Sequence, residues 1–357
     1  MTIAVHISDP ESLLLDPLRL VAAEQPEDRF LLFCNETIET LPENFLQVII
    51  PPKPKNKLPL FYWYRYKLPS LLKKYNASAF ISDAGMLSMR SDLPQYLFFG
   101  NTDFEKINGY WSRIFLAGLL KASAIFSAED FISEKLKKFK VPEEKIQTIY
   151  RGIKPLPAAE NISAVLLKEK FTDGVDYFIY PVDEYSAAHT LTVLKAFSQL
   201  KKWQKTSMKL VLLNETHSEE IVSDFKNYKY RDEVRIILPK EKNADSLIGH
   251  AFAVIFFSVY DAVLHPFHAM MNKVPVIAAE NEINKSLFAK GALYTDITAT
   301  ALAERMQMLY KDEQYKNSLV HEGSLVLSKY DPEQTAHLLR EEINNKRVIP
   351  LKKITAE

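Results

Sequence analysis

The stretch that decides the fold is AIFSAEDFISEKLKKFKVPEEKIQTIYRGIKP, residues 124–155. An apolar run, Ser123–Ser127, leads into a helical pattern, Glu129–Lys138, which has two acids in its first turn. A second apolar run follows at Ile146–Tyr150. A strand, a helix and a strand at this spacing predict a βαβ unit with two parallel strands. The proline-containing segment KPLPAAE, Lys154–Glu160, then predicts a domain boundary.

The same alternation continues in both directions from this unit. Further apolar runs predict strands at Thr2–Ser8, Arg29–Asn35, Leu46–Ile50, Ala77–Ser82, Gln95–Phe99, Tyr177–Pro181, Met208–Asn214, Val234–Leu238, Phe252–Ser258 and Pro275–Ala278. Helical patterns lie between or after them at Pro59–Tyr75, Tyr110–Lys121, Ala187–Trp203, Ala299–Tyr310 and Asp331–Asn344. In the last of these, Asp331 is the predicted N-cap and Pro332 the first helical residue. We predict an α/β fold with two Rossmann-like, doubly wound sheets that face each other across a ligand cleft.

The length of the chain also favours two domains. Its 357 residues are too many for one ordinary core. We expect an N-terminal Rossmann-like domain at residues 1–157 and a C-terminal one at residues 158–335. We expect the last segment, residues 336–357, to form a helix and tail that pack back toward the N-terminal domain.

Composition excludes several classes of function. Lysine plus arginine and aspartate plus glutamate both number 45, so the surface offers no broad positive footprint for nucleic acid. The one cysteine, Cys34, excludes an internal disulfide framework and a multi-cysteine zinc site. No basic segment followed by an apolar stretch opens the chain, so we expect a cytoplasmic protein.

Glycines are few, and their positions bear on nucleotide binding. None of the nine occurs before Gly85, and none lies between Gly174 and Gly249. The chain contains neither G-x-G-x-x-G nor the P-loop pattern, in which glycines let backbone N–H groups approach phosphate. The sequence therefore argues against a conventional NAD site and against a P-loop.

Three stretches together resemble the family-four glycosyltransferases, which have the GT-B fold. They are residues 124–155, YFIYPVDEYSAAHTLTVLKAFSQL at 177–200, and ADSLIGHAFAVIFFSVYDAVLHPFHAMMNKVPVIAA at 244–279. The final helices, through HEGSLVLSKYDPEQTAHLL at 321–339, follow in the family's order. The resemblance implies retaining, metal-independent sugar transfer from a nucleotide sugar to a glycan or a lipid-linked acceptor. It implies an acceptor-side first domain, a donor-side second domain, and no cofactor.

The charged residues by which that family holds its donor are replaced in this chain. Alignment on Ala196–Phe197 places Asp183 at the phosphate-binding arginine and Ala188 at the phosphate-binding lysine. Alignment on Ala269–Met270 and Pro275–Val276 places Tyr260 and His268 at the positions of the family's two glutamates. The resemblance implies two further donor-cleft positions, His189 and His265. Because a charge-assisted hydrogen bond contributes roughly 1.5–3 kcal/mol, losing both cations costs about 3–6 kcal/mol. His268 could still bond a ribose hydroxyl.

Two hypotheses follow from this departure. One is a glycosyltransferase with an unusual donor site. The other is a non-catalytic GT-B protein that serves an active glycosyltransferase as a partner subunit or carbohydrate-binding module. Fold analogy favours the enzyme, and the lost cations favour the binding protein.

Two weaker patterns concern metal and acid chemistry. Asp261, His265 and His268 form D-x-x-x-H-x-x-H, which could suit zinc, but a helix start that lines the cleft explains the pattern more simply, and we expect no metal. In GNTDFE, after Gln95–Phe99, Asn101 and Asp103 are the nearest equivalents of an H-D-like pair beside the acceptor. Asp103 could act on an acceptor hydroxyl, and we prefer the interpretation that it caps the following helix.

One segment mixes lysines with aromatic residues. It is PPKPKNKLPLFYWYRYKLPSLLKKY, residues 51–75. It could make a weak peripheral contact with the inner face of an anionic membrane. The simpler interpretation is a loop followed by an amphipathic helix, with its aromatic residues inward and its lysines in water.

Overall fold

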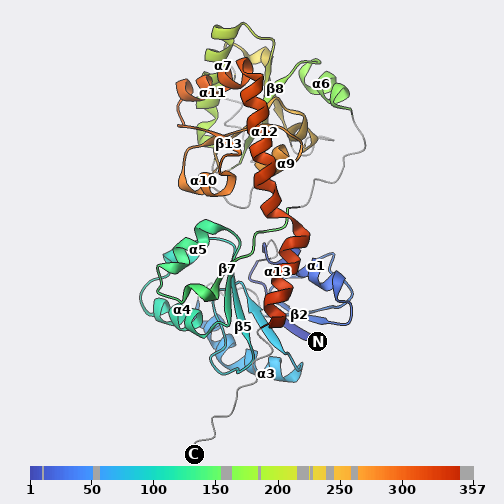
Figure 1. The fold of residues 1–357 in the computed structure, drawn as a ribbon, viewed down its shortest axis with the longest axis vertical. Helices are drawn as coiled ribbons and strands as arrows, with labels where there is room; N and C mark the ends of the chain where they lie inside the picture. Colours follow the sequence, from blue (N-terminus) through green and yellow to red (C-terminus); the bar gives the residue numbers. More distant parts are fainter. Residues whose placement is uncertain are drawn as a thin grey trace, which may run out of the picture. The chain divides into compact units, whose positions relative to one another are not determined.

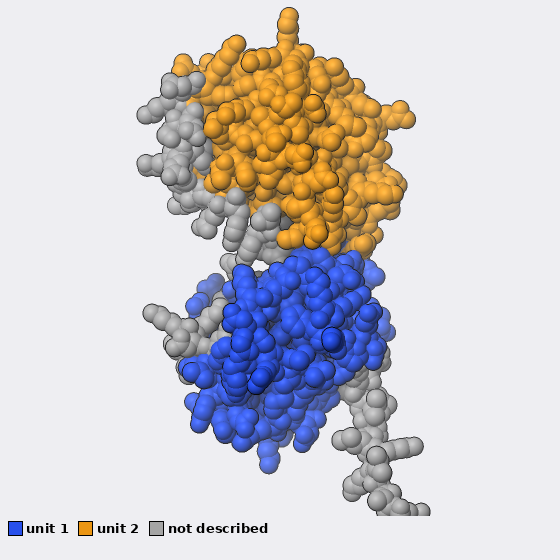
Figure 2. Space-filling view, turned by 90° about the vertical axis from the view of Figure 1, so that its left-hand side faces the viewer, with its two compact units in different colours: residues 1–152, 330–357 blue, residues 153–329 orange. Residues whose placement is uncertain are grey.

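The computed structural model describes residues 1–9, 12–50, 57–153, 163–183, 186–214, 225, 228–238, 245–258 and 264–345. The chain forms two compact units (Figures 1 and 2). Unit 1 contains residues 1–152 and 330–357, and unit 2 contains residues 153–329. Among the described residues, no helix combines the length and apolar character needed to cross a bilayer.

Unit 1 is built on a seven-stranded parallel sheet in the order β3-β2-β1-β4-β5-β6-β7. The strands are β1 Thr2–His6, β2 Arg29–Cys34, β3 Phe45–Ile49, β4 Ala79–Ser82, β5 Gln95–Phe99, β6 Ala124–Ser127 and β7 Ile146–Thr148. The helices are α1 Leu15–Glu24, α2 Lys57–Tyr62, η1 Trp63–Lys67, α3 Leu68–Lys74, η2 Asp103–Lys106, α4 Tyr110–Lys121, α5 Asp130–Lys137, η3 Glu143–Lys145 and α13 Pro332–Asn345. Strands β4, β5 and β6 are buried throughout, as expected of a parallel sheet covered by helices on both faces.

Unit 2 contains a six-stranded parallel sheet in the order β10-β9-β8-β11-β12-β13. Its strands are β8 Tyr177–Val182, β9 Lys209–Asn214, β10 Val234–Ile237, β11 Ala253–Phe256, β12 Val276–Ala279 and β13 Ala292–Thr295. Its helices are α6 Ala164–Thr172, η4 Ala187–His189, α7 Thr190–Gln204, η5 Arg231–Glu233, η6 Asp245–His250, α9 His265–Met271, α10 Glu282–Phe288, α11 Ala299–Lys311 and α12 Glu313–Leu327, with η7 Ser328–Tyr330 at the return to unit 1. The two doubly wound α/β sheets predicted from the sequence are both present.

The helix that ends the described chain starts where the sequence predicts. Asp331 Oδ1 accepts a hydrogen bond from Glu333 N at 3.0 Å, which confirms Asp331 as the N-cap of α13. Helix α13 packs on α1, where Arg340 and Glu24 form an ion pair of 2.9 Å. Cys34 is buried in the core of unit 1, as a small apolar residue would be.

The segment from α2 to α3 differs from the simple amphipathic helix. Its middle turn, η1, is a π-helix, which offsets the positions on either side of it. Trp63 and Tyr64 point into the core, whereas Tyr62 is 65% exposed and Tyr66 is also exposed. The expectation that the aromatic residues all turn inward is therefore wrong for half of these four.

Candidate functional site

In each unit the strand order reverses at one point. The connections that leave the two strands flanking this point run in opposite directions along the sheet. In unit 1 this point lies between β1 and β4, and in unit 2 it lies between β8 and β11. Open α/β sheets bind ligands at the carboxyl ends of the strands that flank such a reversal. Both sites are therefore built from the residues that follow these four strands.

At the reversal in unit 1, a tripeptide occurs twice. Strand β1 leads into Ile7–Asp9 and β4 ends in Ile81–Asp83, and both read Ile-Ser-Asp. Strands β1 and β4 are paired neighbours with His6 opposite Ser82, so Asp83 comes beside the first residues of Ile7–Asp9. This brings together residues that are about 75 positions apart in the sequence.

Asp83 is the central group of this arrangement. Its Oδ1 accepts a hydrogen bond from Ser8 N at 2.7 Å, and the hydroxyls of Ser8 and Ser12 also donate to the carboxylate. Its removal from water raises the pKa of Asp83 to about 6, against the opposing effect of these donors. The residue remains partly accessible. A carboxyl that titrates near neutral pH at a sheet reversal can act as a general base.

A buried chain of hydrogen bonds holds the end of β4 in place. His6 Nδ1 lies 2.7 Å from the hydroxyl of Tyr64, which lies 2.6 Å from Ser82 Oγ. Ser82 Oγ in turn accepts from Ala84 N at 3.2 Å. Burial lowers the pKa of His6 to about 4, so its imidazole is neutral at physiological pH. We interpret His6 and Tyr64 as positioning residues that fix the turn carrying Asp83.

The residues predicted after β5 do not join this cluster through any hydrogen bond that the structure shows. Asn101 Oδ1 accepts from Asp103 N at 2.9 Å, so Asn101 supplies the side-chain oxygen that closes this turn. The carboxylate of Asp103 is exposed and pairs with Lys106 at 2.7 Å. The preferred interpretation of Asp103 as the helix cap is wrong, because Asp103 is the first residue of η2 and the N-cap position is occupied by Thr102.

In unit 2, Asp183 follows β8 directly and is committed to the local backbone. Its Oδ1 accepts from Ser186 N at 2.6 Å, and Ser186 Oγ accepts from Asp183 N at 2.9 Å. The hydroxyl of Tyr180 donates to Ser186 O at 2.7 Å beneath this turn. The pair of reciprocal bonds closes the turn that starts η4 and α7. Asp183, which the resemblance aligns with the family's arginine, thus has a structural role in this turn.

The histidines predicted for the donor side lie on η4 and α9, the helices that follow β8 and β11. His189 ends η4, and its ring lies edge-on to Phe257, which follows β11, with 6.1 Å between ring centroids. His265 begins α9, and His268 lies one turn later and is 6% exposed. Tyr260 and Asp261 lie outside the described residues. Among the residues that are described, no three histidine, cysteine or acidic side chains gather as a metal site would require.

Ala188 is exposed in η4, at the start of the α7 helix. The resemblance aligns it with the family's phosphate-binding lysine, and its own side chain is uncharged. The local dipole of the helix and its first N–H groups still favour an anion.

The sequence pattern alone did not single out Asp83, Ser8 or Ser12. The available signal was the repeated Ile-Ser-Asp after two buried runs, each placed where a parallel strand ends. Recognising it requires knowing that the first and fourth strands are neighbours, which the sheet order supplies.

Comparisons with known proteins agree on the fold. No protein-family model matches the chain, and no curated protein matches its sequence. Solved structures do match over nearly the whole length: a glycosyltransferase from Rickettsia africae ESF-5 (14% identity, 96% of this chain and 99% of that one, TM-score 0.74) and Anabaena HepE in complex with UDP (13%, 96% and 99%, TM-score 0.72). WaaG, a glycosyltransferase involved in lipopolysaccharide biosynthesis, matches at 12% identity over 96% and 99%, with a TM-score of 0.68. HepE was also solved with UDP-glucose. The chain therefore has the α/β fold of the GT-B glycosyltransferases.

Proposed function

We propose that this protein transfers a sugar from a nucleotide sugar to a hydroxyl group of a glycan or lipid-linked acceptor, without a metal ion. The observation that carries the proposal is Asp83, a partly accessible carboxyl with a pKa near 6 that three donors hold at the sheet reversal of unit 1. The binding of UDP and UDP-glucose by a protein of the same fold supports the choice of donor.

In the proposed reaction, unit 1 binds the acceptor and unit 2 binds the nucleotide sugar. The Asp83 carboxylate accepts the proton of the acceptor hydroxyl while the hydroxyl oxygen bonds to the anomeric carbon. The bond from that carbon to the diphosphate breaks, and the nucleoside diphosphate leaves. The resemblance to family-four glycosyltransferases supports retention of configuration at that carbon, which requires the acceptor oxygen to enter on the same face of the sugar from which the diphosphate leaves.

A second candidate is a non-catalytic GT-B protein that binds carbohydrate or serves an active glycosyltransferase as a subunit. It is supported by the two residues that the resemblance aligns with the phosphate-binding cations, since Ala188 is exposed and uncharged and Asp183 closes its own turn. In this candidate Asp83 is only a structural carboxyl, and its substitution leaves the protein's role intact.

The two candidates predict different changes in melting temperature and different donor consumption when the protein is tested with a panel of UDP- and GDP-sugars. Transfer predicts that one donor raises the melting temperature and is consumed only when an acceptor glycan is present. The effect on melting should fall in His268→Ala, because that histidine is proposed to bond the nucleotide ribose. Donor binding without turnover over the whole panel, together with stable association with an active glycosyltransferase, would instead establish the second candidate.

Ala188→Lys is expected to tighten the binding of UDP by about tenfold, because it adds one charge-assisted hydrogen bond at a partly solvated site. Ala188 is exposed, so the longer side chain needs no repacking. Isothermal titration with UDP measures the change. Ala188→Gln is the matched control, since it adds similar length without charge. Equal effects of lysine and glutamine would contradict the proposed location of the diphosphate.

We also propose a cytoplasmic protein that touches a membrane surface weakly through residues 51–75. Leu58, Tyr62 and Tyr66 are exposed on α2 and η1, next to the basic residues Arg65 and Lys67. Exposed aromatic side chains among cations are typical of interfacial segments. Residues 51–56 of this segment lie outside the described residues.

A further inference from the structure

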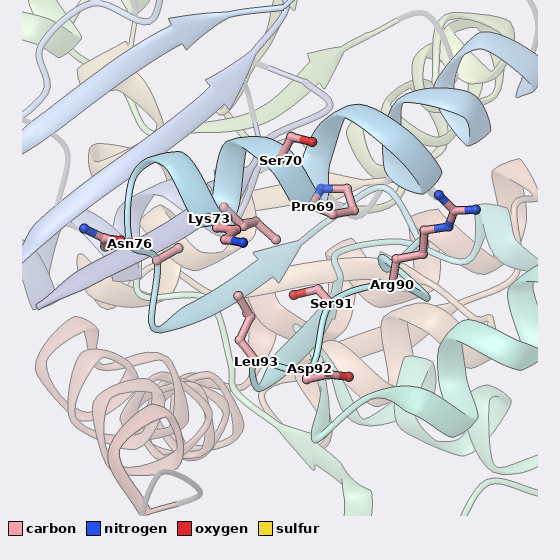
Figure 3. A pocket seen from close by; sticks show the side chains of 10 residues that line it. Pro69, Ser70, Lys73, Asn76, Arg90, Ser91, Asp92 and Leu93 are labelled. Atoms are coloured by element: carbon pink, nitrogen blue, oxygen red, sulfur yellow. The ribbon is translucent and has the colours of Figure 1, made fainter.

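A hollow lies on the side of the unit 1 sheet where β4 and β5 begin. One wall is α3 with the turn that follows it, and the other is the segment just before β5. Its volume is about 520 Å³, and its lining includes Ser70, Lys73, Asn76, Arg90, Ser91 and Leu93 (Figure 3). Asp83 follows the opposite end of β4, so this hollow is separate from the proposed reaction site.

The two cations of this hollow have no acidic partner among the described residues. Lys73 and Arg90 are both exposed, and neither forms an ion pair within that part of the chain. The Arg90 guanidinium lies over the ring of Tyr66, 4.6 Å from its centroid, which holds it beside the hollow. Asp92 lines the hollow, but its carboxylate is turned away from Lys73 in Figure 3.

A hydroxyl faces these cations from a rigid wall. Ser91 is 9% exposed, and no described residue hydrogen-bonds to its hydroxyl. Its backbone oxygen accepts from Gln95 Nε2 at 3.3 Å, and Gln95 also bonds Ser88 N and Ser88 O at 2.9 and 2.8 Å. Lys73 and Ser91 reach toward each other from the two walls (Figure 3). An ammonium and a hydroxyl thus border one open space, and Arg90 lines its edge with the guanidinium turned away from both, over the ring of Tyr66.

We propose that this hollow binds a phosphate monoester. A phosphate monoester carries between one and two negative charges at neutral pH and three strong acceptor oxygens, which match two cations and a hydroxyl better than a singly charged carboxylate does. Lys73 and Ser91 contact the phosphate, Arg90 approaches it from one end, and Leu72 and Leu93 cover the rest of the ligand. The ligand is either a free phosphate ester or the headgroup of a phosphomonoester lipid. The proposal does not depend on glycosyl transfer.

Titration of the full chain with glycerol 3-phosphate, followed by NMR or calorimetry, tests the site. Two charge-assisted contacts at an open surface predict a Kd on the order of 1 mM, which weakens as salt is added. Lys73→Ala and Arg90→Ala should each weaken binding by about tenfold. Lys74→Ala is the matched control, because this neighbouring lysine lies over the ring of Tyr75 and does not line the hollow.

Vesicles separate the two sources of the phosphate. Glycerol 3-phosphate that binds, with phosphatidic acid vesicles sedimenting no more protein than phosphatidylcholine vesicles, identifies a free ester. Sedimentation with phosphatidic acid vesicles that Lys73→Ala abolishes and Lys74→Ala spares identifies a lipid headgroup. Absence of binding to both probes, or equal losses in the Lys73 and Lys74 variants, would overturn the proposal, since diffuse charge then accounts for any attraction.

Discussion

Replacing Arg151 by methionine is expected to lower the free energy of unfolding by about 3–5 kcal/mol. Arg151 is 3% exposed and Glu129 is 1% exposed, and Arg151 Nε lies 3.6 Å from Glu129 Oε1. Removing the cation leaves the carboxylate charge in the interior without the guanidinium that it faces. Such a truncation costs far more than the intact pair contributes, because a buried charge is expensive when its partner is absent.

The position of this pair makes the loss consequential. The chain leaves unit 1 after Gly152 and returns to it at Tyr330, and the Tyr330 hydroxyl donates to Glu129 Oε2 at 2.8 Å. Burial and the Glu129 carboxylate raise the pKa of Tyr330, so it stays a donor at physiological pH. Residues next to both crossing points are therefore held by the same carboxylate.

Urea denaturation of Arg151→Met and of Arg151→Met/Glu129→Gln measures the effect. The double variant should be the more stable of the two, because glutamine removes the buried charge and still accepts from Tyr330. Lys106→Met is the matched control, since it breaks an exposed ion pair with Asp103 that contributes about 1 kcal/mol or less. If the Arg151 variant lost no more than the Lys106 variant, the buried pair would have no special role.

The fold could be predicted largely from local patterns. Parallel strands are buried on both faces, so they occur in the sequence as continuous apolar runs. The run at residues 209–214, buried at every position, is an example. Strand β13, Ala292–Thr295, was not predicted, because only Ala292 and Leu293 form an apolar run before Tyr294 and Thr295. The π-helical turn at Trp63–Lys67 was not predicted, because it changes the helical spacing over a single turn only. The pattern of apolar residues over the whole segment therefore still resembles that of an α-helix.

The sites were harder to predict, because they depend on contacts between distant segments. Asp183 and His268 were predicted from the resemblance, and they follow β8 and β11, the strands that flank the sheet reversal of unit 2. The residue type of Asp183 does not reveal that its carboxylate accepts a hydrogen bond from the nearby Ser186 N. Asp83 acquires its properties from Ser8 and Ser12, which reach it only once β1 and β4 pair.

Asp83→Asn is expected to reduce the rate of the proposed transfer by about 10²- to 10⁴-fold, the usual contribution of a general base. In the wild-type protein the rate should rise as the pH passes through about 6, where half of the carboxylate is ionised, and should level off at higher pH. The variant should lack this inflection. A single-turnover assay over pH 4.5–8 with a saturating donor measures both.

Ser12→Ala distinguishes a base from a merely structural carboxyl. The Ser12 hydroxyl stabilises the ionised form of Asp83 and lowers its pKa, so its loss should move the inflection to higher pH with little change in the plateau rate. An unchanged profile in Ser12→Ala, or an Asp83→Asn variant with normal turnover, would remove Asp83 from the reaction.

The stability of Asp83→Asn tests the same environment without any assay of activity. Because the pKa of Asp83 is raised from 3.8 to about 6 in the folded state, the proton is held more tightly there than in the unfolded chain. The stability that this proton confers is fully present below about pH 4 and is lost as the pH rises through 6. The neutral asparagine carries no such loss, so at pH 8 the variant should melt no lower than the wild type. The ionised Asp83 therefore destabilises the folded protein at the pH of the cell, although three donors hold it in place. Such a loss of stability is expected where a reaction requires a charged group.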